Sequence, residues 1–219
     1  MTGTFDIDLM IRVLPFFLQA AQLTILISVL SVALGLACGA LGTAARLARN
    51  PLARLLGAAY VSVFRGTPAL IQLFLLYFGG PQIGIHLDAV TASVIALGVN
   101  IGAYMTETMR GAIVAVDKGQ TEAARTLGLG RARAFVDVVL PQAARLMVRP
   151  LGINIIAQIK TTAIVAAIAV VELTYTAQRY IGSTYKPFEM FILAGLIYMA
   201  IIYVVSLLIR WLDRKVQLP

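Results

Sequence analysis

Five apolar stretches, each long enough to cross a lipid bilayer, constrain this chain more than any other feature. A spanning helix needs about 20 consecutive, mostly apolar residues. The stretches cover residues 15–43, 57–80, 89–109, 148–171 and 188–210. Only 13% of the residues are charged, roughly half the fraction of an ordinary soluble domain. The sequence therefore predicts an all-α membrane protein, a single domain over 1–219, with five transmembrane helices and a first stretch retained as a span rather than removed as a signal.

The basic residues are distributed unevenly between the two sides that these spans define. Thirteen follow or precede the spans on one side: Arg46, Arg49, Arg54, Arg110, Lys118, Arg125, Arg131, Arg133, Arg145, Arg149, Arg210, Arg214 and Lys215. The other side carries Arg12, Arg179 and Lys186. Cytoplasmic loops are enriched in Lys and Arg. This asymmetry predicts a periplasmic N-terminus and a cytoplasmic C-terminus, as an odd number of spans requires. It also accounts for the net charge of +8 without nucleic acid as a partner.

A polar island of about 40 residues, 110–149, interrupts the apolar sequence between spans three and four. Asp117 with Gln120 three residues on is typical of a capping box that starts a helix. Ala123 and Ala124 give this helix a small-residue face, and Gly128 with Gly130 can end it in a left-handed cap. We expect such a helix to fit a groove in another protein; the alternative is an amphipathic helix resting on anionic lipid.

A second interruption falls inside the second apolar stretch. Arg65-Gly66-Thr67-Pro68 removes a backbone donor and loosens the helix, and an arginine near a membrane edge can extend its head group to water. We expect the preceding residues, 52–64, to lie obliquely at the cytoplasmic interface.

The island contains the pattern E-A-A-x3-G-x9-V-x-L-P, from Glu122 to Pro141. This spacing resembles the cytoplasmic loop with which bacterial ABC-importer permeases dock on their ATPase. Further blocks resemble the polar amino-acid branch of these permeases, the histidine, glutamine and arginine systems, over residues 18 to 211. They are Phe64-Arg65-Gly66-Thr67-Pro68 with Gln72-Leu73-Phe74, Tyr104, Glu107, Arg110 and Gly111, Lys118 to Ala124, Leu140-Pro141-Gln142-Ala143, Lys160-Thr161-Thr162, and Glu172-Leu173.

The resemblance implies a permease subunit of an ATP-driven importer for amino acids or closely related polar solutes, in the bacterial inner membrane. A cytoplasmic coupling loop at about 112–147 would contact the ATPase. Its candidate coupling residues are Gly119, Glu122, Ala123, Ala124, Arg125, Gly128, Leu140 and Pro141. The implied partners are an ABC ATPase dimer, a second permease as homodimer or heterodimer, a periplasmic solute-binding protein and membrane lipid. ATP and Mg²⁺ would bind to the ATPase and no cofactor to this chain.

Polar side chains at membrane depth are candidates for the solute path because their burial is costly. They are Asn100, Glu107, Asn154, Gln158, Lys160 and Glu172. Each also has a structural interpretation. Glu107 can pair with Arg110, Lys160 with an acid or carbonyl, and Asn100 can belong to a packing seam with Gly98 and Gly102. Asn154 and Gln158 can form interhelical hydrogen bonds, and Glu172 can be an exposed helix-end charge. Around Asn154, and at residues 160–164, the sequence departs from the branch pattern, which leaves open which amino acid or derivative, opines included, is carried.

The sequence also excludes several chemistries. It contains no G-x4-G-K-[ST] loop, so ATP cannot bind here by that motif and no catalytic residue is predicted. The single Cys38 and single His86 offer no disulfide framework, metal site or nucleophile–base pair. A stand-alone secondary transporter or channel remains the alternative. It is disfavoured because such proteins are usually built from paired repeats, and none is visible in this sequence.

Overall fold

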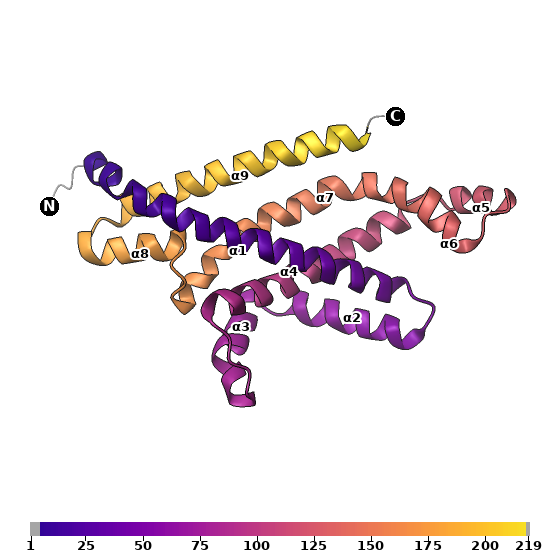
Figure 1. Cartoon of the computed structure of the whole chain (residues 1–219), viewed down its shortest axis with the longest axis horizontal. Helices are drawn as coiled ribbons and strands as arrows, with labels where there is room; N and C mark the ends of the chain where they lie inside the picture. The colour runs from indigo at the N-terminus through magenta and orange to yellow at the C-terminus, as the bar shows by residue number, and fades with distance from the viewer. Residues whose placement is uncertain (1–4, 218–219) are drawn as a thin grey trace.

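The computed structural model describes residues 5–217, and within this range every regular element is helical (Figure 1). The α-helices are α1 (Ile7–Leu47), α2 (Pro51–Gly66), α3 (Ala69–Phe74), α4 (Ala89–Val114), α5 (Lys118–Thr126), α6 (Arg131–Arg133), α7 (Leu140–Thr161), α8 (Leu173–Thr184) and α9 (Pro187–Gln217). π-Helical turns (Leu75–Gly79 and Ala134–Val139) and 3-10 turns (Gly80–Ile83 and Thr162–Ile168) complete the helical segments.

Four helical runs are long and apolar enough to cross a membrane: Ile7–Leu47, Ala89–Val114, Arg131–Ile168 and Pro187–Val216. A fifth crossing requires the pair Pro51–Gly66 and Ala69–Ile83, bent by 103°, to count as one span. The all-α class is confirmed, and four of the predicted apolar stretches lie in helical runs long enough to cross, whereas the number five depends on this bent pair. The helices also run past the predicted stretches, because capped polar ends extend them. At the start of α1, for example, Asp6 accepts a hydrogen bond from the Leu9 amide at 2.8 Å.

The long helices α1, α2, α4, α7 and α9 run along the length of the molecule, with the N-terminus at one end and the C-terminus part of the way toward the other (Figure 1). α8 lies at the N-terminal end, and α5 and α6 lie at the opposite end. α3 and the turns after it project sideways from the bundle. The polar island at 110–149 is largely helical. α4 extends into it as far as Val114, α5 lies within it, and a further helical run begins at Arg131.

Small residues let α1 and α4 approach closely. A Cβ atom on Gly39 of α1 would lie 2.9 Å from Met105 Cβ, and one on Gly102 of α4 would lie 2.6 Å from Cys38 Cβ. Thr43 adds an interhelical hydrogen bond to the Thr106 carbonyl at 3.1 Å. Close backbone approach through small residues is a common way for helices to associate inside a bilayer. The packing interpretation of the glycines that flank Asn100 is confirmed.

α2 packs along these two helices as part of the bundle. Tyr60 donates a 2.7 Å hydrogen bond to the Val99 carbonyl in the middle of α4, and a Cβ on Gly57 would lie 3.1 Å from Ala45 Cβ of α1. The position of residues 52–64 relative to the membrane interface stays a prediction. A hydroxyl bond and a close glycine contact hold this segment against its neighbours.

Two apolar clusters fill the bundle. One joins α1, α8 and α9 around Phe17, Leu173 and Met190, each 0% exposed. The other joins α1, α3, α4 and the 3-10 segment around Ile27, Leu73 and Val165. The second cluster fixes α3 and the end of α7 beside α4, which positions the polar groups described next.

Candidate functional site

The helix break between α2 and α3 is held by two side-chain amides. Pro68 has no amide hydrogen, so carbonyls at the end of α2 lose helical partners. Asn100 Nδ2 of α4 donates to the Phe64 carbonyl at 2.9 Å and to Gln72 Oε1 at 3.1 Å. Gln72 Nε2 in turn donates to the carbonyls of Phe64 and Thr67, at 3.0 and 3.1 Å. The break is thus a hydrogen-bonded structure rather than a loose hinge.

A pocket of about 550 Å³ lies beside this break, between α2, α4 and α7. Its size is typical of small-molecule sites. Three predicted path residues line it: Asn100, Asn154 and Gln158. Asn154 Nδ2 donates to Thr108 Oγ1 of α4 at 2.9 Å, which confirms the interhelical bond foreseen for it. The prediction that residues 154 and 158 share a helix face is also confirmed.

Gln158 differs from the other amides in the pocket. Its side chain is 2% exposed, and its Nε2 atom has no hydrogen-bond partner among the described residues. Buried donors in native structures almost always have partners. A ligand oxygen, or a rearrangement of the pocket, would supply one here.

Arg65 is a site residue that the sequence analysis did not select. It lines the pocket, and its Cζ atom lies 5.1 Å from the centre of the Tyr104 ring. That cation–π contact holds the guanidinium at the pocket wall. The signal in the sequence was an arginine next to a helix-breaking Gly-Thr-Pro run inside an apolar stretch, a position where charge is costly unless it is used.

The remaining path candidates do not line this pocket. Glu107 accepts from Arg110 at 2.7 Å and from Arg46 of α1 at 3.3 Å. Pairing with Arg110 is confirmed, and Arg46 extends it to a triad that joins α1 to α4. Lys160 is exposed, and no ion pair or hydrogen bond of its side chain to another residue in the range 5–217 is found, so the proposed pairing is absent.

Glu172 had two interpretations, a residue of the solute path or an exposed helix-end charge. The second is wrong, because Glu172 is 0% exposed. Its Oε1 caps α8 by accepting from the Tyr175 amide at 2.8 Å, and its Oε2 accepts from the Tyr198 hydroxyl of α9 at 2.7 Å. Burial raises the pKa of this carboxyl above its usual range, against the hydrogen bonds that lower it. The local sequence did not indicate this burial, because it depends on Tyr198 of α9, 26 residues further along the chain.

A larger depression, about 780 Å³, lies between α1 and α8. Its lining includes Gln19, Gln22 and Arg179, whose side chains are exposed. It lies at the end of the bundle that holds α8, and its lining does not include the residues of the helix break. We regard the smaller pocket as the site because it gathers buried, oriented polar groups.

The island helix α5 has defined ends. Asp117 Oδ1 caps it by accepting from the Gly119 amide at 2.7 Å. The reciprocal half of the predicted capping box is absent, because Gln120 Oε1 accepts instead from Gln142 Nε2 at 3.1 Å. At the other end Gly128 has a left-handed φ of 85°, and the Leu129 amide donates to the Ala124 carbonyl at 3.1 Å. This is a Schellman cap.

Gly128 thus ends α5 as predicted, whereas Gly130, with φ of −65°, opens the next helix. Leu140 and Pro141 begin α7 in the continuous run from Arg131, where they join the island to the fourth apolar span. Both side chains are exposed.

Not all of the predicted coupling residues on α5 are exposed. Gly119, Glu122, Ala123 and Arg125 are exposed. Ala124 is only 4% exposed, because this face of α5 packs on the turn at 134–139, so its close fit is internal. Leu127, absent from the predicted set, is 83% exposed at the tip. An isolated apolar side chain at such a tip is a candidate anchor for a partner.

Comparison with known proteins gives consistent results. Residues 31–218 match the family described as binding-protein-dependent transport system inner membrane component. The probable amino-acid ABC transporter permease protein YckA of Bacillus subtilis is 37% identical, covering 96% of this chain and 93% of the relative. The nopaline transport system permease protein NocM of Agrobacterium fabrum is 35% identical, covering 97% of this chain and 94% of the relative.

Among solved structures, the crystal structure of an amino acid ABC transporter with histidines has a TM-score of 0.91 at 35% identity, covering 97% of this chain and 100% of that one. An inward-facing form of the MetNI methionine ABC transporter has a TM-score of 0.72 at 19% identity, covering 98% of this chain and 100% of that one, a likeness of fold alone.

Proposed function

The chain belongs to the family of binding-protein-dependent transport system inner membrane components, and from that premise we propose how it works as a permease subunit of an ABC importer. Relatives named as glutamine, arginine and nopaline permeases support an amino acid or a close derivative as the solute. We propose that this solute passes through the pocket beside the α2–α3 break.

The composition of that pocket carries the proposal. Its lining contains one cation, Arg65, and no carboxylate. The free Nε2 of Gln158 adds a second donor. Guanidinium groups bind carboxylates through paired, charge-assisted hydrogen bonds. The pocket therefore favours a solute with at least one free carboxylate, as every amino acid has, and its own walls offer no acid for a basic side chain.

The ammonium group of such a solute needs acceptors and has several in the same pocket. Amide oxygens of Asn154 and Gln158, the Thr161 hydroxyl and the face of the Tyr104 ring all belong to the lining. Neutral acceptors bind an amino acid weakly enough to release it, which a transport path requires.

We propose that the end of the bundle with α5 is cytoplasmic, since most of the thirteen basic residues identified above flank helix ends there. α5 would then dock on an ABC ATPase subunit, with Leu127 as apolar anchor and Glu122 and Arg125 in polar contacts. ATP with Mg²⁺ would bind on that partner. Closing of the ATPase dimer would move α5, and the continuous helix from Arg131 would transmit the motion to Asn154 and Gln158.

The opposite end fits protein partners as well. Gln19 and Gln22 place exposed amides on an apolar helix, where lipid contact would leave them without partners. A second permease subunit, identical or homologous, and a periplasmic solute-binding protein would cover this polar surface. The chain would thus be a multi-pass protein of the bacterial inner membrane with five crossings.

The test substitutes Arg65 in a reconstituted importer. R65Q should lower ATP-driven uptake of labelled amino acid by roughly 10-fold or more, since a charge-assisted bond to a carboxylate contributes about 1.5–3 kcal/mol. The matched control is R54Q, an exposed arginine of the same helix, which should leave uptake near wild type. Uptake by R65Q equal to that of R54Q, with the ATPase still bound, would remove the pocket from the path.

A further inference from the structure

The groove between α7 and α9 combines an apolar floor with a basic rim. It has a volume of about 540 Å³. The floor consists of Gly152, Ile153, Ile156 and Ile209, and the rim carries Arg149, Arg210 and Arg214 with one acid, Asp213. Neither the solute pocket nor the α5 surface uses these residues.

The floor is fixed by a close helix crossing. A Cβ atom on Gly152 would lie 2.6 Å from Ile209 Cγ2, so the two helices touch there and the groove opens beside the crossing. Ile153 is 69% exposed. The exposed apolar wall therefore begins at the point of contact and continues along α9.

The charge of the rim is positive. Asp213, 8% exposed, accepts from Arg149 Nε at 2.8 Å, while the Arg149 side chain stays 69% exposed. Arg210 and Arg214 are one helical turn apart and both exposed. Three guanidinium groups against one carboxylate leave two positive charges in excess. An anion is the complementary occupant.

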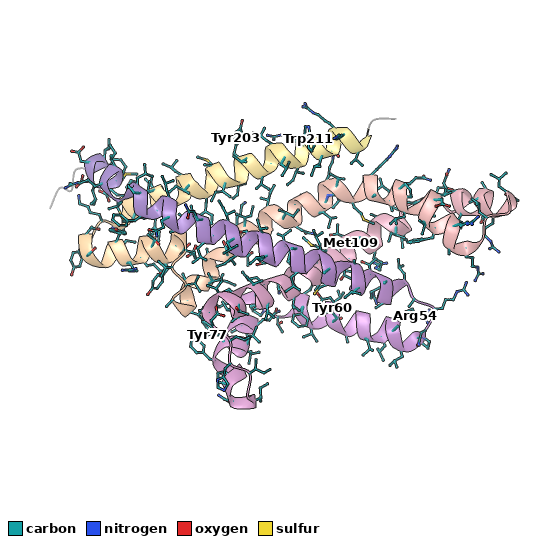
Figure 2. All side chains as sticks on the ribbon, viewed as in Figure 1. Arg54, Tyr60, Tyr77, Met109, Tyr203 and Trp211 are labelled. Atoms are coloured by element: carbon teal, nitrogen blue, oxygen red, sulfur yellow. The ribbon has the colours of Figure 1, made fainter. Side chains whose placement is uncertain are left out.

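The position of the groove indicates a membrane surface. Only 11% of the apolar window of α9 is buried, so most of this helix beyond its first turns faces outward. Figure 2 shows Tyr203 and Trp211 on the side of α9 away from the bundle, where they are 61% and 53% exposed. Lys215 Nζ lies 4.8 Å from the centre of the Trp211 ring. Tryptophan with a neighbouring lysine is typical of the level of lipid head groups.

We propose that this groove is a binding site for an anionic phospholipid. The phosphate occupies the rim between Arg149, Arg210 and Arg214, and an acyl chain lies on Ile153 and Ile156. Basic pockets between membrane helices are known to hold anionic head groups. A second copy of this chain bound symmetrically at this groove is a poor occupant, because its own Arg149, Arg210 and Arg214 would face this rim with like charge.

Lipid retention tests the assignment directly. The full chain, purified through a tag with whichever subunits stay bound, is mixed in detergent with dioleoylphosphatidylglycerol or dioleoylphosphatidylcholine, and bound lipid is counted by native mass spectrometry. The anionic lipid should be retained preferentially. R210Q/R214Q should bind it roughly 30-fold more weakly, about fivefold for each arginine removed.

The control R49Q/R54Q removes the same charge from exposed arginines at the α1–α2 connection and should leave retention near wild type. R210K/R214K keeps the charge and should retain most binding, which separates loss of charge from misfolding. Equal retention of the two lipids, or equal loss in R210Q/R214Q and R49Q/R54Q, would overturn the proposal.

A competition separates a lipid from a free anion. Excess glycerophosphoglycerol or inorganic phosphate carries the same phosphate chemistry without acyl chains, and neither should displace the lipid. Displacement by either would make the groove a soluble-anion site and overturn the lipid assignment.

Discussion

The close approach of α1 and α4 at Gly102 makes a quantitative prediction. In G102A the new Cβ would lie 2.6 Å from Cys38 Cβ, 2.7 Å from the Tyr60 hydroxyl and 3.1 Å from the Gly35 carbonyl. Overpacking of this kind costs about 1–3 kcal/mol. The Tyr60 hydroxyl cannot swing aside freely, because it donates to the Val99 carbonyl at 2.7 Å, and losing that bond costs about 1 kcal/mol more.

The control for this prediction is G111A on the same helix. A Cβ at Gly111 meets nothing within 4 Å. Both substitutions gain the same helix propensity, about 0.5–1 kcal/mol, so this gain cancels between them. G102A should therefore be less stable than G111A by about 2–4 kcal/mol. Removing the Tyr60 hydroxyl as well, in G102A/Y60F, should recover part of the loss.

The assay is unfolding of the purified chain in detergent, by titration with dodecyl sulfate and by heating, followed through the helical circular dichroism signal. G102A should unfold at the lowest dodecyl sulfate concentration and the lowest temperature of the three proteins. G111A should unfold at no lower concentration or temperature than wild type. Stabilities of G102A and G111A within about 0.5 kcal/mol, the usual range for substitutions that disturb no packing, would refute the packing argument.

Two further predictions concern the ends of short helices. G128A should destabilise the C-terminal end of α5 by about 1–2 kcal/mol, because a left-handed φ of 85° is unfavourable for alanine. Hydrogen exchange of the Leu129 amide should then accelerate in G128A but not in the control G130A. Unchanged exchange in G128A would count against the cap. For Glu172 the folded-state pKa is raised above its ordinary value of 4.5. Its contribution to stability is then greatest below that pH and is lost as the pH rises through the raised value. In E172Q the amide oxygen can still accept from the Tyr175 amide and the amide nitrogen can donate to the Tyr198 hydroxyl oxygen. The variant should therefore lose this pH dependence, with stability at neutral pH no lower than wild type; a wild-type dependence of opposite sign would contradict the burial argument.

Much of the fold could be predicted from the sequence because its determinants are local. Runs of apolar residues identify the crossings, and Asp117 and Gly128 mark the ends of α5 through side-chain and backbone preferences of single residues. The lengths of the helices could not be predicted in the same way. α1 and the run from Arg131 continue into polar sequence because caps and ion pairs supply partners there, and hydropathy does not register them.

The candidate site was predicted in part. The four-residue spacing of Asn154 and Gln158 places both on one helix face, and they do line the pocket. Arg65 could not be placed beside them, because its position depends on the 103° bend after Gly66. The exposed interpretation of Glu172 was wrong because its burial involves Tyr198 of α9, a contact that no local pattern encodes.

The most direct test of the account is ATP-driven uptake in proteoliposomes. The chain is reconstituted with its ATPase and second permease, with ATP on the side of α5 and solute-binding protein with labelled amino acid on the other. We predict accumulation that requires both ATP and the binding protein and continues without any ion gradient. Accumulation that needs neither, and follows a proton or sodium gradient instead, would contradict the account and make the chain a secondary transporter.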